Sequence, residues 1–113
     1  MKTLELIIPV FNEQDNILTF YNTCKSTLNV YDDISFSFLF IDDGSTDSTR
    51  SIIKDLVHSF SDVKLISLSR NFGKESALTA GIDFSSADAI IPIDVDLQDP
   101  PSEIWILKKS SGP

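Results

Sequence analysis

The sequence predicts an α/β fold, a parallel sheet that is covered by helices on both faces. Two observations predict it: short apolar runs rich in β-branched residues alternate with segments of helical spacing, and each apolar run ends in a polar cluster. Strands and helices in strict alternation require right-handed crossovers between parallel strands. At 113 residues, with 42% hydrophobic and 23% charged residues, the chain is typical of one globular domain.

The first predicted strand and helix lie near the N-terminus. Residues 4–10 form an apolar run with one charge, and Pro9 places the end of this buried strand near Ile8. Residues 14–28 follow as a helix, because apolar side chains recur there at helical spacing. Its predicted buried positions are Ile17, Leu18, Tyr21, Cys24 and Leu28. Cys24 is the only cysteine, so no internal disulfide or cysteine-based zinc site can form, and we expect a buried, inert thiol.

The second strand is predicted over residues 35–41, where alternating phenylalanines give it an aromatic face. The acidic turn at residues 42–45 ends this strand, and Ser45 or Thr46 is expected to cap a helix that extends to about Phe60. The predicted core positions of this helix are Ile52, Ile53, Leu56, Val57 and Phe60. His58 lies off this stripe, and we assign it no role.

The third strand is predicted over residues 63–68, and a turn at residues 70–74 leads into a third helix. Small residues on that helix permit close packing on the sheet, and its inward positions are Ala77, Leu78, Ala80, Gly81 and Phe84. Residues 88–93 supply the fourth strand, at which we expect the sheet to end. The predicted domain covers residues 1–104, and residues 105–113 form a tail that is unstructured from Lys108 onward.

Two aspartates follow the fourth strand directly. Asp94 and Asp96 are separated by one residue, so in extended geometry their carboxylates point the same way, and Gln98 continues the row with a neutral oxygen. Pro100 and Pro101 then stop any regular continuation. Oxygen ligands held this close suit a hard divalent cation such as Mg²⁺ or Mn²⁺. The alternative is that these aspartates only form a turn or cap a helix.

Every unusual polar cluster comes immediately after a predicted strand. The clusters are Asn12-Glu13, Asp42-Asp43-Gly44-Ser45, Arg70-Asn71 with Lys74, and Asp94 with Asp96 and Gln98. The carboxyl ends of parallel strands meet at one edge of the sheet, where ligands of such folds bind. The chemistry fits a nucleoside diphosphate: a carboxylate after the second strand accepts hydrogen bonds from a base or ribose, and Asp94 and Asp96 hold a metal on the diphosphate. Arg70 or Lys74 meets the remaining negative charge.

The charge of the chain limits its partners. A formal net charge of -8 argues against a nucleic-acid or anionic-membrane surface, because both need clustered lysine and arginine. The glycine-rich dinucleotide fingerprint and the Gly-Lys-Ser/Thr phosphate loop are both absent, which removes the commonest alternatives for this architecture. The single cysteine fits a reducing cytosol, and the sequence contains neither an apolar signal region at the N-terminus nor a run of about 18 apolar residues. We therefore expect a soluble, cytoplasmic chain whose full-length form lies at the inner face of the membrane.

Four ordered motifs give the sequence a specific resemblance. They are Ile8-Pro9-Val10-Phe11-Asn12-Glu13, Ile41-Asp42-Asp43-Gly44-Ser45-Thr46-Asp47, Arg70-Asn71-Phe72-Gly73-Lys74 and Asp94-Val95-Asp96-Leu97-Gln98-Asp99-Pro100-Pro101. Over about residues 4–104 the chain resembles family 2 glycosyltransferases, and most of all their polyprenyl-phosphate branch, the dolichyl-phosphate mannose synthases and bactoprenol glucosyltransferases. The resemblance implies the Rossmann-like nucleotide-sugar-binding half of a GT-A fold and inversion at the anomeric carbon.

The resemblance also implies roles for individual residues. The nucleoside of a UDP- or GDP-sugar would be contacted by Pro9, Phe11, Glu13, Asp42 and Asp43. Asp94 and Asp96, the expected catalytic pair, would hold Mg²⁺ or Mn²⁺ against the diphosphate together with Gln98. The acceptor would be a polyprenyl phosphate or a glycan, in cell-envelope synthesis.

The chain departs from the family pattern after Pro101, because family members continue into strands that build the acceptor site and often into membrane helices. We therefore expect a shortened form without the acceptor half, which would associate with itself and meet the membrane only through the missing segments. One alternative is a non-catalytic remnant that binds nucleotide sugars. Another is a phosphoacceptor receiver domain, which fits poorly because the acidic pair follows the second strand and no late strand ends in lysine.

Overall fold

A computed structural model describes residues 2–96 and 107–108 of the chain. The strands are β1 (Lys2–Val10), β2 (Ile34–Asp42), β3 (Val63–Ser67), β4 (Ala89–Pro92) and β5 (Leu107–Lys108). The helices are α1 (Ile17–Leu28), α2 (Thr49–Ser59) and α3 (Lys74–Phe84). Strands and helices therefore alternate up to β4, as the sequence predicts.

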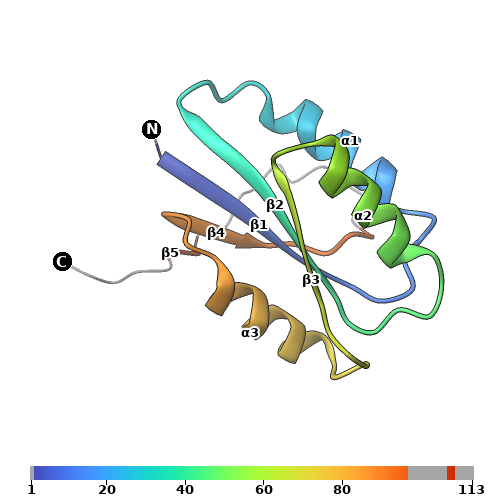
Figure 1. Ribbon diagram of the computed structural model, residues 1–113. Helices are drawn as coiled ribbons and strands as arrows, with labels where there is room; N and C mark the ends of the chain where they lie inside the picture. Colours follow the sequence, from blue (N-terminus) through green and yellow to red (C-terminus); the bar gives the residue numbers. More distant parts are fainter. Residues whose placement is uncertain (1, 97–106, 109–113) are drawn as a thin grey trace.

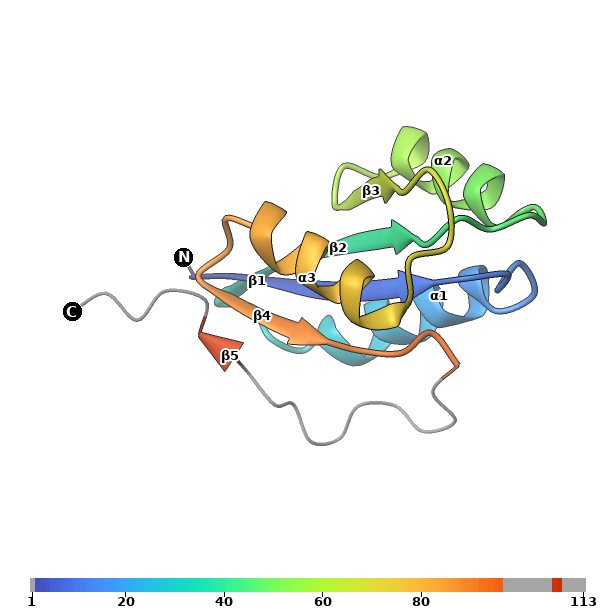
Figure 2. The ribbon, with the colours of Figure 1, turned by 90° about the horizontal axis from the view of Figure 1, so that it is seen from below.

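The strands form one sheet in the order β3-β2-β1-β4-β5, which Figure 2 shows side by side. β1 is central and pairs in parallel with β2 on one side and with β4 on the other. Strand order therefore reverses between β1 and β4, the kind of switch point at which open parallel sheets bind ligands.

β1 continues to Val10, two residues beyond the predicted end at Ile8. Pro9 is tolerated inside it because β4 pairs only as far as Ile7, opposite Pro92. In a parallel strand successive residues direct their backbone groups to alternate neighbours, and Ile7 accepts a hydrogen bond from the Ile93 amide on the β4 side. The amide that Pro9 lacks would point the same way, past the end of β4, so no ladder hydrogen bond is lost.

The sheet does not end at its fourth strand. β5 pairs antiparallel with β4, Ala89 opposite Lys108 and Ile90 opposite Leu107, so the sheet is mixed. The predicted parallel sheet of β1 to β4 is confirmed, but the prediction that the sheet ends at its fourth strand is wrong, and Lys108 lies in a strand and not in an unstructured tail. The physical reason is that β4 would otherwise present unpaired amide and carbonyl groups at an open edge. A two-residue strand is too short to leave a periodic pattern in the sequence.

The helices cover both faces of the sheet, as predicted: α1 and α2 lie on one face and α3 on the other (Figure 1). Phe38, Phe40 and neighbouring apolar residues of β1 fill the larger core beneath α1 and α2. The smaller core beneath α3 contains Ile7, Leu39, Ile41, Ala77 and Ile90. A side chain at Gly81 would place its Cβ 2.6 Å from both Ile7 and Ile41, which confirms that small residues let α3 pack closely.

The buried faces of the helices are narrower than predicted. Leu18, Val57, Phe60 and Phe84 are all exposed, although the sequence pattern assigned them to the core. Leu18 and Val57 each lie one residue, or about 100° of helix rotation, beyond a buried neighbour. Phe60 and Phe84 stand at helix ends. Phe20 instead completes the buried stripe of α1.

Both helices α1 and α2 also begin later than predicted, at Ile17 and Thr49. The residues before each helix are committed to the loop contacts described below. Cys24 is buried as expected, and burial raises the pKa of its thiol to about 11, which agrees with an inert role. Within residues 2–96 and 107–108, no helix has the length and apolar character needed to cross a membrane.

Candidate functional site

A cavity of about 190 Å³ opens at the carboxyl ends of β1 and β4, beside the first residue of α3. Its lining is formed by Pro9, Val10, Phe11, Glu13, Asp43, Lys74, Asp94, Val95 and Asp96. Sequence reasoning assigned most of these residues to one ligand site, and the fold brings them together from four separate segments of the chain. The assembly follows from the parallel topology, which gathers the strand ends at one edge.

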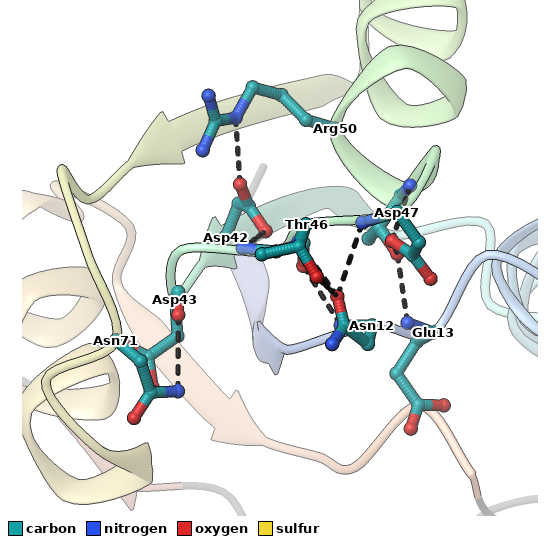
Figure 3. Close-up of polar contacts among 10 residues, drawn as sticks. Asn12, Glu13, Asp42, Asp43, Thr46, Asp47, Arg50 and Asn71 are labelled. Atoms are coloured by element: carbon teal, nitrogen blue, oxygen red, sulfur yellow. Dashed lines mark hydrogen bonds and ion pairs between the residues drawn. The ribbon is translucent and has the colours of Figure 1, made fainter.

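Three of the predicted site residues are not placed in the cavity lining. Asp42 is fully buried, and its carboxylate accepts hydrogen bonds from Arg50 Nε at 2.8 Å and from the Ser45 amide at 3.2 Å (Figure 3). The Arg70 guanidinium lies over the Phe72 ring, 4.7 Å from its centroid. Gln98 lies outside the described residues.

Asp43 anchors the loop that precedes α3. Its carboxylate is almost fully buried and accepts hydrogen bonds from the Phe72 amide at 2.8 Å, the Gly73 amide at 3.0 Å and Asn71 Nδ2 at 3.2 Å. Hydrogen bonds to an ionised carboxylate are stronger than those between neutral groups. The end of β2 therefore fixes the backbone position from which Lys74 enters the cavity.

Gly44 allows this loop to come close. A Cβ at Gly44 would lie 2.4 Å from the carbonyl carbon of Arg70, and the residue has φ of +80°, in the left-handed region that favours glycine. The glycine in the Asp-Asp-Gly-Ser motif is thus explained by backbone packing against residues 70–71.

Asn12 is a structural residue to which sequence reasoning gave no role of its own. It adopts φ of +53°, which asparagine tolerates better than most residues. Its Oδ1 accepts hydrogen bonds from the amides of Thr46 at 2.8 Å and Asp47 at 3.3 Å, and its own amide donates to Ser45 Oγ at 2.9 Å (Figure 3). Asn12 therefore joins the loop after β1 to the loop after β2. The only sequence signal is an asparagine directly after a strand.

The same two loops are joined again at the start of α2. The Glu13 amide donates to the buried Thr49 Oγ1 at 2.8 Å, and the Thr49 hydroxyl donates to Asp47 Oδ1 (Figure 3). Slight burial would raise the pKa of Asp47, but hydrogen bonds from Thr49 and from the Gln14 amide lower it below its usual value. The Glu13 side chain lines the cavity, and its Oε2 accepts a hydrogen bond from Asn16 Nδ2 at 3.0 Å.

Lys74 and Asp94 form an ion pair inside the cavity lining, with 2.5 Å between Lys74 Nζ and Asp94 Oδ1. The Lys74 side chain is 58% exposed and the Asp94 side chain 46% exposed. Asp96 is more exposed still, and no ion pair of Asp96 occurs within the described part of the chain. Both carboxylates thus line the same cavity, but Asp94 is paired with a lysine and Asp96 has no ion pair among the described residues.

The sequence argument assumed that Asp94 and Asp96 continue the strand in extended geometry, but they do not. β4 ends at Pro92, residues 95–96 lie in a turn, and Val95 between the aspartates is buried in the larger core. Both carboxylates nevertheless line the same cavity. The buried Val95 fixes the backbone between them.

The carboxylates of Asp94 and Asp96 fit Mg²⁺ or Mn²⁺ as a partial set of ligands. Over residues 2–96 and 107–108 no group of three or more histidine, cysteine or acidic side chains forms a complete cation site. Mg²⁺ is usually bound through one or two carboxylates together with water and substrate phosphates, rather than by an all-protein cage. Asp94 and Asp96 match that pattern, because they offer two oxygen ligands beside open space.

The sequence matches the family model described as "Glycosyl transferase family 2" over residues 5–108. The chain is 50% identical over 99 residues to the bactoprenol glucosyl transferase of Shigella phage SfV. It is equally similar, 50% over 99 residues, to the prophage bactoprenol glucosyl transferase homolog of Escherichia coli strain K12. Each match covers 86% of this chain but 31% of the relative, so the chain spans less than a third of the length of these curated relatives.

Solved structures show the same fold. The mannosyltransferase PcManGT from Pyrobaculum calidifontis, solved with GDP-Man and Mn²⁺, superposes with a TM-score of 0.73 at 20% identity, over 87% of this chain and 29% of that one. Staphylococcus aureus TarS 1-349, solved with UDP, gives a TM-score of 0.69 at 23% identity, over 85% of this chain and 28% of that one. The Rossmann-like GT-A fold predicted from the sequence is thereby confirmed.

Proposed function

Because this chain belongs to glycosyl transferase family 2, we propose that it is the donor-binding part of an inverting enzyme that transfers a sugar from a nucleoside diphosphate sugar to a polyprenyl phosphate. The observation that carries the proposal is the grouping of residues from three strand ends and the start of α3 around one cavity. A set of unrelated turns would not line a common space in this way. The same grouping argues against a simple capping role for Asp94 and Asp96.

The nucleoside is assigned to the wall formed by the loop after β1. Pro9 and Phe11 supply apolar contact there, and Glu13 supplies a hydrogen-bond acceptor for a base or ribose. Asp43 lines the cavity as well, but its buried carboxylate already accepts hydrogen bonds from Phe72 and Gly73 and holds the neighbouring loop in place. Asp42 supports this wall from behind through Arg50, since its own carboxylate is buried and already bound. Asp42, which the resemblance assigned to the nucleoside contacts, would therefore support the loop instead.

The diphosphate is assigned to the opposite wall. Asp94 and Asp96 would hold Mg²⁺ or Mn²⁺ there, and the bound ion would neutralise the charge that develops on the departing nucleoside diphosphate. Lys74 brings the only basic side chain found in the cavity lining among the described residues. One lysine offsets little of the charge of a diphosphate, and the chain carries a net charge of -8, so a bound metal ion would have to compensate most of the rest.

The proposed acceptor rests on the curated relatives, which carry the name bactoprenol glucosyl transferase. A phosphate monoester has a second pKa of about 6, so a polyprenyl phosphate is largely ionised near neutral pH and needs no general base to attack the anomeric carbon. We assign the full-length protein to cell-envelope synthesis at the cytoplasmic face of the membrane. The acceptor wall would come from sequence that the relatives have beyond the matched region.

Calorimetric titration with UDP-glucose and with GDP-mannose tests the donor assignment. We expect one of the two to bind in the presence of MnCl₂ and neither to bind measurably in EDTA, because the metal supplies most of the compensating charge. Equal affinity with and without metal would contradict the metal assignment. Failure of both nucleotides to bind, with the fold confirmed by circular dichroism, would contradict the proposed function.

A radiolabelled transfer assay with membrane lipid extract tests whether residues 1–113 bind the donor without providing the acceptor site. We expect little or no transfer by residues 1–113 alone and robust transfer by a version extended with the natural downstream sequence. In-line positioning of the acceptor supplies roughly 7 to 11 kcal/mol of the barrier, and most of it is lost without an acceptor wall. Metal-dependent lipid glycosylation by the 113-residue chain would place the acceptor site within it and contradict this expectation.

A further inference from the structure

Lys74 occupies an electrostatically unfavourable position in its helix. It is the first residue of α3, where the helix dipole places positive charge, and an acidic residue such as Glu75 is the favourable kind there. A lysine at this position therefore does not stabilise the helix. Its compensation comes from across the cavity, from Asp94 Oδ1 at 2.5 Å.

The backbone and the side chain of Lys74 differ in freedom. The backbone just before it is held by the hydrogen bonds from the Phe72 and Gly73 amides to the buried Asp43. The side chain is 58% exposed and has a flexible four-carbon stem, and its ion pair with the half-exposed Asp94 is weakened by solvent. The Lys74 ammonium can therefore change partners while α3 stays in place.

A metal ion and this ammonium compete for the Asp94 carboxylate as the pair stands. The ammonium lies against Oδ1 at hydrogen-bond distance, and a divalent cation placed beside it would be repelled. Asp94 and Asp96 are also the two carboxylates best placed for a metal. Metal binding at Asp94 therefore favours the departure of Lys74, and a diphosphate in the same cavity is a partner to which its ammonium can move.

We propose that Lys74 is a placeholder cation, which occupies Asp94 while the site holds no metal and transfers to the donor diphosphate when metal and donor bind. The inference rests on the proposed function and adds a regulatory consequence. Metal alone must compete with Lys74, whereas metal and diphosphate together give both cations a partner. Each ligand then strengthens the binding of the other, as a coupling between two ligands must be reciprocal.

The affinity for Mn²⁺ without nucleotide tests the placeholder directly, because removal of the Lys74 charge should raise that affinity. In Lys74→Met, which keeps the apolar stem and loses the charge, we expect Mn²⁺ to bind roughly fivefold more tightly or better by calorimetry. UDP affinity at saturating Mn²⁺ should fall in the same variant. A residue that merely oriented Asp94 for the metal would give the opposite sign for Mn²⁺.

Two further variants separate this effect from general electrostatics. Lys25→Met removes the same charge from a lysine of similar exposure, 51%, which is paired with the less exposed Asp62 at 2.7 Å, outside the cavity lining. It should leave Mn²⁺ affinity unchanged. Lys74→Arg keeps a cation at the site and should restore the weak Mn²⁺ binding of the unmodified chain. Thermal midpoints of all three variants confirm that each is folded.

The outcomes distinguish the inference from the proposed function. Tighter Mn²⁺ binding by Lys74→Met with no UDP binding by the unmodified chain would support the placeholder and contradict the donor assignment. Unchanged or weaker Mn²⁺ binding, including no measurable binding by either protein, would overturn the placeholder whatever UDP does. An equal gain in Lys25→Met would overturn it as well, because net charge would then explain the effect.

Discussion

The two ends of the sheet each carry a lysine paired with a carboxylate, in very different surroundings. At the carboxyl end, Lys74 and Asp94 are both about half exposed. Near the other end, Lys64 Nζ lies 3.2 Å from Glu5 Oε2, and Glu5 is buried in the central strand, where it also accepts a hydrogen bond from Ser37 Oγ at 2.8 Å. Both members of the first pair can take other partners, whereas in the second pair Lys64 is half exposed but Glu5 is confined inside the sheet.

The Glu5 pair lies beside a polar hollow of about 400 Å³ whose lining is rich in serine and threonine hydroxyl groups. Glu5 Oε1 has no hydrogen bond of acceptable geometry within the described residues. Burial raises the pKa of Glu5, but the neighbouring Ser85 hydroxyl, the hydrogen bond from Ser37 and the Lys64 ammonium outweigh it, so the pKa lies below its usual value. The comparison teaches that burial, more than the identity of the pair, separates carboxylates that maintain the fold from those that can bind a ligand.

The largest effect is expected at Asp43, which lines the cavity but is buried like Glu5. Asp43→Ala leaves the Phe72 and Gly73 amides without their acceptor and should lower the free energy of unfolding by about 3 kcal/mol or more. Urea denaturation measures it. A loss below about 1 kcal/mol would mean that position at the cavity, not burial, decides the role of a carboxylate.

A smaller effect with a distinct pH dependence is expected at Glu5. Its folded-state pKa lies below the ordinary value of 4.5, so its contribution to stability is complete above pH 4.5 and is lost as pH falls through the folded-state pKa. Glu5→Gln should therefore reduce stability by roughly 1 to 2 kcal/mol at pH 7. The difference between the two proteins should shrink below pH 4.5.

Urea denaturation of both proteins at pH 7 and at pH 3 measures this dependence. The comparison between variants cancels the titration of Asp47 and Asp88, whose pKa values hydrogen bonds also lower. A difference that stays constant with pH would show that the Glu5 charge adds nothing to the fold.

The smallest effect on stability is expected at Asp96, the most exposed of the carboxylates that line the cavity. Asp96→Asn should change the free energy of unfolding by no more than about 0.5 kcal/mol, or raise it slightly by relieving repulsion with Asp94. Metal-dependent nucleotide binding should weaken by about tenfold, equivalent to about 1.4 kcal/mol. A large loss of stability would instead favour a capping role for this residue.

Sequence reasoning reached the fold because alternation of strands and helices is a local pattern, repeated along the chain. It also reached most of the cavity lining, because parallel topology brings strand ends to one edge without any knowledge of side-chain contacts. The anchoring role of Asp43 was out of reach, since its partners lie about thirty residues later in the chain. The Glu5 pair was equally hidden: it joins β1 to β3 across the intervening β2, and the sequence shows only one charge in an apolar run.

Paramagnetic broadening by Mn²⁺ in the presence of UDP, followed in amide NMR spectra, tests the central claim most directly. If the donor and metal bind at the carboxyl end of the sheet, the amide signals of Val10, Glu13 and Val95 should broaden at the lowest Mn²⁺ concentrations. Signals from Ser37 and Lys64, beside the polar hollow, should persist. Broadening that begins at Ser37 and Lys64 would contradict the account, because it would place the metal at the buried-pair end of the sheet.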